Sequence, residues 1–238
     1  MKLGFLYTCY NEERAVDYSI SELRKHYPEN LIYVVSDGGP SYDFLLEKFS
    51  NLKVSVEEDT MSFTKSITGQ NFLDPIHQEN IRKCTFATIR RIKDAIAYCE
   101  SDYLVMMDPD ALIRGQLNIP ENVKLLGSRI NRHMPKETMR VLEKIPGAKV
   151  IDCWGATPGI FLTSTYLKAL EFVETNPQIL NDLFNSFYAM FAHDFLIPIM
   201  FALIGEEETF NPDIIECNRN FGWRSTSHPL VHQFKEYY

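Results

Sequence analysis

Residues 103–110 read Tyr103-Leu104-Val105-Met106-Met107-Asp108-Pro109-Asp110, and they are the most informative stretch of this sequence. Its first part, residues 103–107, is an apolar run typical of a strand buried in a parallel sheet. In open α/β sheets, ligands bind in the crevice at the carboxyl ends of the strands. Two carboxylates placed there suit a hard divalent cation, which takes carboxylate oxygens together with phosphate oxygens. The alternative is a solvated turn after the strand, with its φ angle fixed by Pro109.

The sequence before this stretch alternates between strand and helix patterns. Strands are predicted at residues 3–9, 31–36 and 54–56, and helices at residues 12–26, 42–49 and 81–99. Asn11 is a suitable N-cap for the first helix. Residues 57–79 form a long irregular connection, of a size that is usually functional. This order favours an α/β fold with a central, mostly parallel sheet flanked by helices.

The sequence beyond residue 110 is less regular. Its patterns predict strands at residues 123–126 and 160–163, and helices at residues 167–173, 179–191 and 195–203. The tail has no clear period. Because no linker forces a boundary, we expect residues 1–238 to form a single domain.

Composition and charge exclude several classes of protein. The net charge of −8 argues against a nucleic-acid binder, which should present a basic face. The longest apolar stretch, residues 195–204, contains Pro198 and is too short to span a bilayer. The N-terminal residues lack the features of a signal peptide, and the five cysteines form no C-x-x-C pair. We therefore expect a cytoplasmic protein with reduced thiols and no transmembrane segment.

Polar residues follow three of the predicted strands. Residues 8–12 read Thr-Cys-Tyr-Asn-Glu, residues 36–39 read Ser-Asp-Gly-Gly, and residues 108–110 read Asp-Pro-Asp. Because the tips of parallel strands lie along the same edge of a sheet, we expect these groups to lie close together. The edge would then hold a Tyr/Asn pair suited to a nucleobase, an Asp suited to base or ribose, and a metal site.

These motifs, in this order, resemble those of nucleotide-sugar-dependent glycosyltransferases with the Rossmann-like GT-A fold. Residues 10–13 (Tyr-Asn-Glu-Glu) resemble the nucleotide-binding turn of that family, and residues 34–39 (Val-Val-Ser-Asp-Gly-Gly) its second strand with a base-binding Asp. Residues 108–110 resemble its metal-binding Asp-x-Asp motif. Residues 232–235 (His-Gln-Phe-Lys) resemble the tail of several members, in which a His completes the metal site and a Lys meets the diphosphate.

The resemblance implies roles for particular residues. Residues 1–110 would form the nucleotide-binding half, and residues 111–238 the acceptor half with the tail. The metal ligands would be Asp108, Asp110 and His232, holding Mn²⁺ or Mg²⁺, with His228 as the alternative histidine. The residues expected to contact the nucleotide or donor are Thr8, Tyr10, Asn11, Asp37, Arg91, Asp108 and Lys235. Arg91 is included because it flanks the buried stripe of its predicted helix, whereas Arg90 points away.

Two further segments concern the acceptor. Trp154 and Gly155 lie in a Gly-rich turn, where an indole face can stack on a sugar ring; the alternative is a Trp that anchors the core. Asp194 begins an apolar helix, and in the family an acid here contacts the acceptor or acts as base. Its alternative role is that of an N-cap. Asp194 would be a general base if the reaction inverts the anomeric centre, and would only orient substrate if it retains.

The sequence therefore predicts a metal-dependent glycosyltransferase that moves a sugar from a nucleoside-diphosphate sugar to a hydroxyl acceptor, with a glycan favoured. Uracil is favoured as the base by family frequency alone. Two alternatives stay open. In a haloacid-dehalogenase-like phosphatase, Asp108 would be the nucleophile and Asp110 the acid/base, although that loop usually lies near the N-terminus. The other alternative is a non-catalytic module that binds nucleotide sugars.

Overall fold

The computed structural model of the protein describes residues 1–60, 75–128, 132–151, 153–154, 159–186, 193–216 and 226–232. Its strands are β1 (Leu3–Cys9), β2 (Ile32–Asp37), β3 (Leu52–Glu57), β4 (Tyr103–Met107), β5 (Ala111–Ile113), β6 (Leu125–Gly127), β7 (Arg132–His133), β8 (Cys153–Trp154), β9 (Ile160–Leu162), β10 (Glu208–Phe210), β11 (Ile214–Glu216) and β12 (Leu230–His232). Its helices are α1 (Glu13–His26), the 3₁₀ helix η1 (Asp43–Leu45), α3 (Pro75–Cys99), α4 (Lys136–Glu143), α5 (Thr163–Thr175), α6 (Pro177–Phe184) and α7 (His193–Leu203).

A seven-stranded sheet forms the centre of the molecule, in the order β10-β6-β9-β4-β1-β2-β3. Neighbouring strands are parallel except where β9 runs antiparallel to β4 and β6. Every strand except β9 therefore ends at the same side of the sheet, which we call the carboxyl edge. The predicted α/β fold with a mostly parallel sheet is confirmed.

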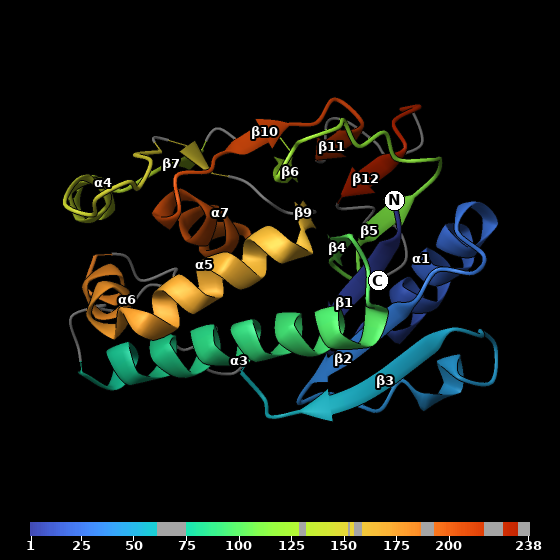
Figure 1. The fold of residues 1–238 in the computed structure, drawn as a ribbon. Coiled ribbons are helices and arrows are strands. Elements are labelled where there is room, and N and C mark those ends of the chain that lie inside the picture. Colours follow the sequence, from blue (N-terminus) through green and yellow to red (C-terminus); the bar gives the residue numbers. More distant parts are fainter. Residues whose placement is uncertain are drawn as a thin grey trace.

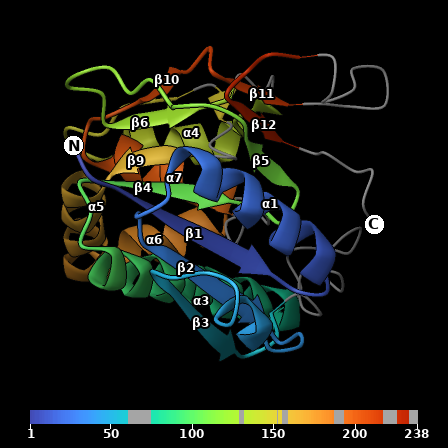
Figure 2. The same cartoon turned by 90° about the vertical axis from the view of Figure 1, so that its right-hand side faces the viewer.

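Helices cover both faces of this sheet (Figures 1 and 2). On one face, Val16 and Ile20 of α1 belong to the same apolar cluster as Phe5 of β1. On the other face, residues of α3, α5, α6 and α7 form a second cluster with Leu6 and Leu104. Successive residues of β1 and β4 thus enter opposite clusters. This burial on both faces explains why their sequences are continuous apolar runs.

A three-stranded sheet, in the order β11-β12-β5, extends the face that α1 covers. Strand β12 runs antiparallel to β5, with His232 opposite Ala111 and Leu230 opposite Ile113. Because β5 begins directly after Asp110, this pairing brings a strand from the tail of the chain to the acidic turn. A further two-stranded sheet pairs β7 with β8.

The predicted elements differ from the observed ones mainly at their ends. Strands β1 and β4 have the predicted bounds, whereas α3 begins at Pro75, six residues before its predicted start. The short helix predicted at 42–49 is longer than the observed one, because only the 3₁₀ helix η1 forms there. Helix α6 ends at Phe184, so the helix predicted to reach residue 191 is also too long. Within the ranges that the structure describes, the helices are too short or too polar to cross a membrane.

Candidate metal and nucleotide site

The acidic turn lies at the carboxyl end of β4. Strand β4 ends at Met107, and the backbone N–H of Ala111 donates to the carbonyl oxygen of Asp108 at 2.9 Å, which closes a tight turn. Pro109 has the fixed φ angle that suits such a turn. Strand β5 begins at Ala111. The local sequence therefore places Asp108 and Asp110 on either side of one proline at the edge where ligands bind in α/β sheets.

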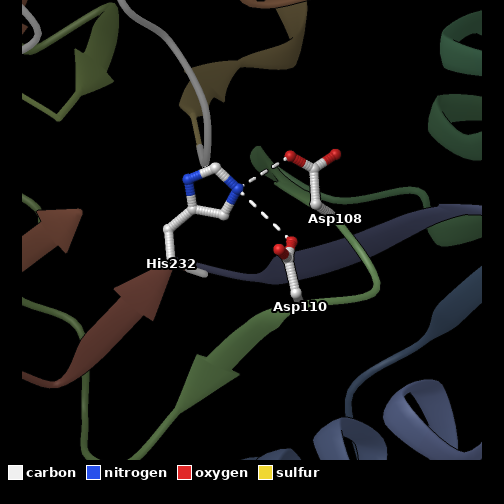
Figure 3. Close-up of side chains that lie close together, drawn as sticks. All are labelled: Asp108, Asp110 and His232. Atoms are coloured by element: carbon white, nitrogen blue, oxygen red, sulfur yellow. Dashed lines mark ion pairs between the residues drawn. The ribbon is translucent and has the colours of Figure 1, made fainter. Parts of the chain in front are cut away.

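His232 completes a cluster with these two acids (Figure 3). Its Nε2 atom lies 3.1 Å from Oδ2 of Asp108 and 3.4 Å from Oδ1 of Asp110. The His232 side chain is 9% exposed, and those of Asp108 and Asp110 are 23% and 16% exposed. Figure 3 shows the ring of His232, at the end of β12, pointing between the two carboxylates. The predicted ligand set therefore converges, although its members come from distant parts of the chain.

The electrostatic field at this cluster favours a positive charge. Burial by itself lowers the pKa of His232, but the hydrogen bonds and negative charges of Asp108 and Asp110 outweigh it and raise the pKa to about 10. In the metal-free chain the proton on Nε2 thus occupies the position between two carboxylates. A cation that takes this position must displace that proton, since a metal-bound imidazole is neutral at the ligating nitrogen.

The donor set fits a divalent cation. One atom from each of Asp108, Asp110 and His232 lies within 4.8 Å of the other two. Ligand atoms that share an ion at about 2.1–2.2 Å lie within roughly 4.4 Å of one another, so small side-chain movements suffice. Carboxylate oxygens suit Mg²⁺ and Mn²⁺, and imidazole is acceptable to Mn²⁺. Three protein ligands also leave positions of a six-coordinate ion for phosphate oxygens.

His228, the alternative tail ligand, has another role. Its Nδ1 atom is hydrogen-bonded to the hydroxyl group of Thr226, and its backbone N–H donates to the same oxygen at 3.2 Å. The carbonyl oxygen of Thr226 in turn accepts from Arg114 at 2.6 Å. His228 therefore belongs to the packing of the segment before β12, and the geometry selects His232 for the acidic turn.

Asp37 lies at the end of β2, and its carboxylate is occupied by protein groups. Arg91 of α3 donates to Oδ1 at 2.6 Å, while the backbone N–H and the hydroxyl of Thr60 donate at 2.8 and 2.7 Å. Arg91 also donates to Glu57 at 3.1 Å. Asp37 and Arg91 are only 2% and 4% exposed. Their predicted contact with a nucleotide stays a prediction, because the structure holds them in contact with each other.

The tip of β1 is fixed by contacts of its backbone. The N–H groups of Tyr10 and Asn11 donate to the Glu12 carboxylate at 2.8 and 2.9 Å. Glu12 is the N-cap residue of α1, so the predicted capping role of Asn11 is wrong. A Cβ atom at Gly39 would lie only 1.9 Å from the carbonyl oxygen of Tyr10, so glycine is required where the tips of β1 and β2 meet. Nucleotide contacts of Tyr10, Asn11 and the half-buried Thr8 stay predictions.

The remaining predicted residues are described only in part by the structure. Asp194 lies in the first turn of α7. Helix α7 leads into β10, a strand that ends at the carboxyl edge, so the helix must run from the carboxyl edge toward the opposite edge of the sheet. That direction places Asp194 toward the carboxyl edge. Gly155, Lys235 and the side chain of Trp154 lie outside the described residues, so their predicted roles stay predictions. Glu57, which contacts Arg91, and Thr60, which contacts Asp37, were not predicted, because partners this far apart leave no local pattern.

Comparisons with known proteins find distant similarity. No family model and no curated protein sequence matches the chain. The fold is similar to TarS from S. aureus, with 19% identity and a TM-score of 0.41 over 71% of this chain and 30% of that chain. It is also similar to the galactosyltransferase LgtC in complex with donor and acceptor sugar analogues, with 13% identity and a TM-score of 0.44 over 96% and 86% of the two chains. A shorter TarS structure in complex with UDP has 16% identity and a TM-score of 0.44, over 88% and 57%.

The chain thus spans less than a third of the first TarS structure. Similarities at this level assign no activity, and the functional conclusion depends on the geometry of the site.

Proposed function

We propose that this chain is a metal-dependent glycosyltransferase of the GT-A type, which moves a sugar from a nucleoside-diphosphate sugar to a hydroxyl acceptor. One observation carries the proposal: Asp108, Asp110 and His232 converge at the carboxyl edge of a parallel sheet. This is the edge at which such sheets bind ligands, and the ligand set suits a cation that also binds phosphate oxygens. A UDP-sugar is the favoured donor and a glycan the favoured acceptor, both from the sequence resemblance.

The side chains have separate tasks in this proposal. Asp108, Asp110 and His232 would hold Mn²⁺ or Mg²⁺ beside the diphosphate of the donor. The ion would supply electrostatic stabilisation of the charge that develops on the diphosphate as its bond to the sugar breaks. The tips of β1 and β2, which Gly39 allows to pack together, would position the nucleoside. Lys235 would neutralise part of the diphosphate charge.

Asp194 is proposed to act on the acceptor. If the reaction inverts the anomeric centre, its carboxylate would accept the proton of the attacking hydroxyl group, and Trp154 with Gly155 would orient the acceptor. The variant Asp194→Asn keeps the size of the side chain and removes the base. A fall in kcat of about 100-fold or more with a little-changed KM would support this role, and an unchanged kcat would contradict it.

Ligand-induced thermal stabilisation tests the proposal directly. The melting temperature of the chain is measured with UDP and with GDP, each with and without Mn²⁺, and donor consumption is then followed by release of UDP from UDP-sugars. At 100 times its Kd, a ligand should raise the melting temperature by about 5–10 °C. This stabilisation should require Mn²⁺ and should vanish in His232→Ala.

His228→Ala is the matched control, because it removes the same side chain from the same segment without touching the acidic turn. It should keep the Mn²⁺-dependent stabilisation. If no nucleoside diphosphate stabilises the wild-type chain with Mn²⁺ present, the transferase proposal is wrong. Binding without consumption of any donor would favour the non-catalytic module, and release of phosphate from a monoester would favour the phosphatase.

A further inference from the structure

Ala111, the residue after the acidic turn, has a backbone carbonyl group that the β5–β12 ladder does not use. The N–H of Arg114 donates to the carbonyl oxygen of Pro229 at 2.7 Å, so these two residues form a hydrogen-bonded pair. Paired residues alternate between hydrogen-bonded and non-hydrogen-bonded positions in antiparallel strands. Counting back along the register, Ala111 and His232 form a non-hydrogen-bonded pair. The polar groups of Ala111 therefore point away from β12.

Both polar groups of Ala111 nevertheless have partners. Its N–H donates to Asp108 within the turn, as described above. Its carbonyl oxygen accepts a hydrogen bond of 2.5 Å from the hydroxyl of Ser19, on α1. Ala111 and Ser19 are both fully buried, so this bond satisfies a carbonyl group in the interior, where an unpaired polar group is costly. One residue of α1 thus fixes the backbone from which the metal turn projects.

Tyr7 of β1 orients the Ser19 hydroxyl. The two hydroxyl oxygens are 2.8 Å apart, and because Ser19 donates to Ala111, Tyr7 is the donor between them. Tyr7 is fully buried in the apolar cluster that also contains Phe5 and Ile20. Hydroxyl groups are costly to bury unless they are hydrogen-bonded, and these two bonds satisfy both hydroxyl groups within the cluster.

We propose that Ser19, oriented by Tyr7, is a positioning residue of the metal site, an inference that rests on the proposed function. It fixes the peptide group that follows Ala111, while the turn fixes the group that precedes it. Asp110 precedes Ala111 in the chain, and His232 lies opposite Ala111 in the sheet. Fixing Ala111 therefore sets the distance between a carboxylate and the imidazole that must share one ion.

The test compares the affinity for Mn²⁺ alone, measured on the full chain by the EPR signal of free Mn²⁺. Ser19→Ala removes the hydroxyl, and Tyr7→Phe removes the group that orients it. Thr163→Val is the matched control, because the Thr163 hydroxyl donates to the carbonyl oxygen of Ser101 at 2.7 Å, at the opposite end of β4. All three variants lose a buried hydroxyl, but only the first two act at the acidic turn.

Ser19→Ala should raise the Kd for Mn²⁺ by about 3- to 10-fold and Tyr7→Phe by about 3-fold, since groups that hold metal ligands in place have effects of this order or larger. Thr163→Val should leave the Kd unchanged while lowering the melting temperature of the metal-free chain. If Ser19→Ala does not fold, Tyr7→Phe alone decides. If Ser19→Ala and Tyr7→Phe both bind Mn²⁺ with the same Kd as Thr163→Val, the role of Ser19 is overturned and the proposed function is unaffected. A wild-type chain that binds no Mn²⁺ would overturn both.

Discussion

Two acidic strand ends lie at the same edge of the sheet, and they differ in the cation that each has beside it. At the end of β2, Asp37 contacts the guanidinium group of Arg91 and is 2% exposed. After β4, Asp108 and Asp110 contact the imidazole of His232 and keep part of their surface exposed. In sequence the two ends look alike, since each is an apolar strand followed by aspartate.

The difference lies in whether the partner can give up its proton. An arginine keeps its charge at every pH of interest, so it cannot give way to a metal ion by losing a proton. A histidine can lose its proton and offer the freed nitrogen as a metal ligand. The first end therefore holds its structure without a ligand, whereas the second can exchange a proton for a metal ion.

Arg91→Met should have the largest effect and should act on stability. It leaves the buried carboxylate of Asp37 without its charged partner, which typically costs about 3–5 kcal/mol of unfolding free energy. Urea denaturation of the metal-free chain measures this loss. The double variant Asp37→Asn/Arg91→Met should regain part of it, because the unpaired charge is gone.

Arg90→Met is the control for this change. Arg90 is the neighbouring residue, and its exposed guanidinium also contacts Glu57, at 3.0 Å. Its loss should cost less than about 1 kcal/mol, as is usual for exposed ion pairs. Equal losses for the two arginine variants would contradict a stabilising role for the buried contact between Arg91 and Asp37.

Asp110→Asn should have the next largest effect and should act on metal binding. The change keeps the size of the side chain but removes one charged ligand, so the Kd for Mn²⁺ should rise by about 100-fold. Asp37→Asn is the same substitution at the other strand end, and without nucleotide it should leave the Kd unchanged. Titration of both variants with Mn²⁺ makes the comparison. Similar losses in the two variants would show that the two ends are not functionally distinct.

A final prediction concerns the pH dependence of stability. The pKa of His232 is about 10 in the folded, metal-free chain, against an ordinary value of 6.5. A raised pKa stabilises the folded state fully below pH 6.5, and this contribution is lost as the pH rises from 6.5 through 10. The melting temperature of the metal-free wild type should fall over this range more than that of His232→Ala. Parallel curves would contradict the ion pair.

The long apolar strands were predicted well, and the short strands β6 and β9 were found near their predicted positions, but β5 and β12 were not predicted. Strands β1 and β4 are buried on both faces and bounded by polar residues, so their ends are visible in the sequence. Strands β5 and β12 have three residues each, too few to show an alternation of apolar and polar residues. They form because they pair with each other, although they lie far apart in the chain. The start of α3 was missed because its first turns carry too few apolar residues to extend the stripe.

The candidate site was predictable where a motif is local. Asp108 and Asp110 follow from the end of an apolar strand, but His232 was named only through the family resemblance, since no spacing connects it to the turn. Asp37 and Arg91 were each predicted to contact the nucleotide or donor. Their contact with each other was not predicted, because they are 54 positions apart in the chain. A sequence shows which side chains can carry a charge, whereas the tertiary structure decides which charges meet.

The pairing of β5 with β12 has a consequence for the synthesis of the protein. His232 comes 122 positions after Asp110 in the chain. At about 5–20 residues per second, a ribosome takes roughly 6–24 s to add the histidine after the second acid. During that time the nascent chain carries both carboxylates without the imidazole, and two of the three proposed ligands would hold an ion only weakly. If the proposed metal site is correct, tight metal binding would therefore be a late step in maturation and would begin only when β12 has docked on β5.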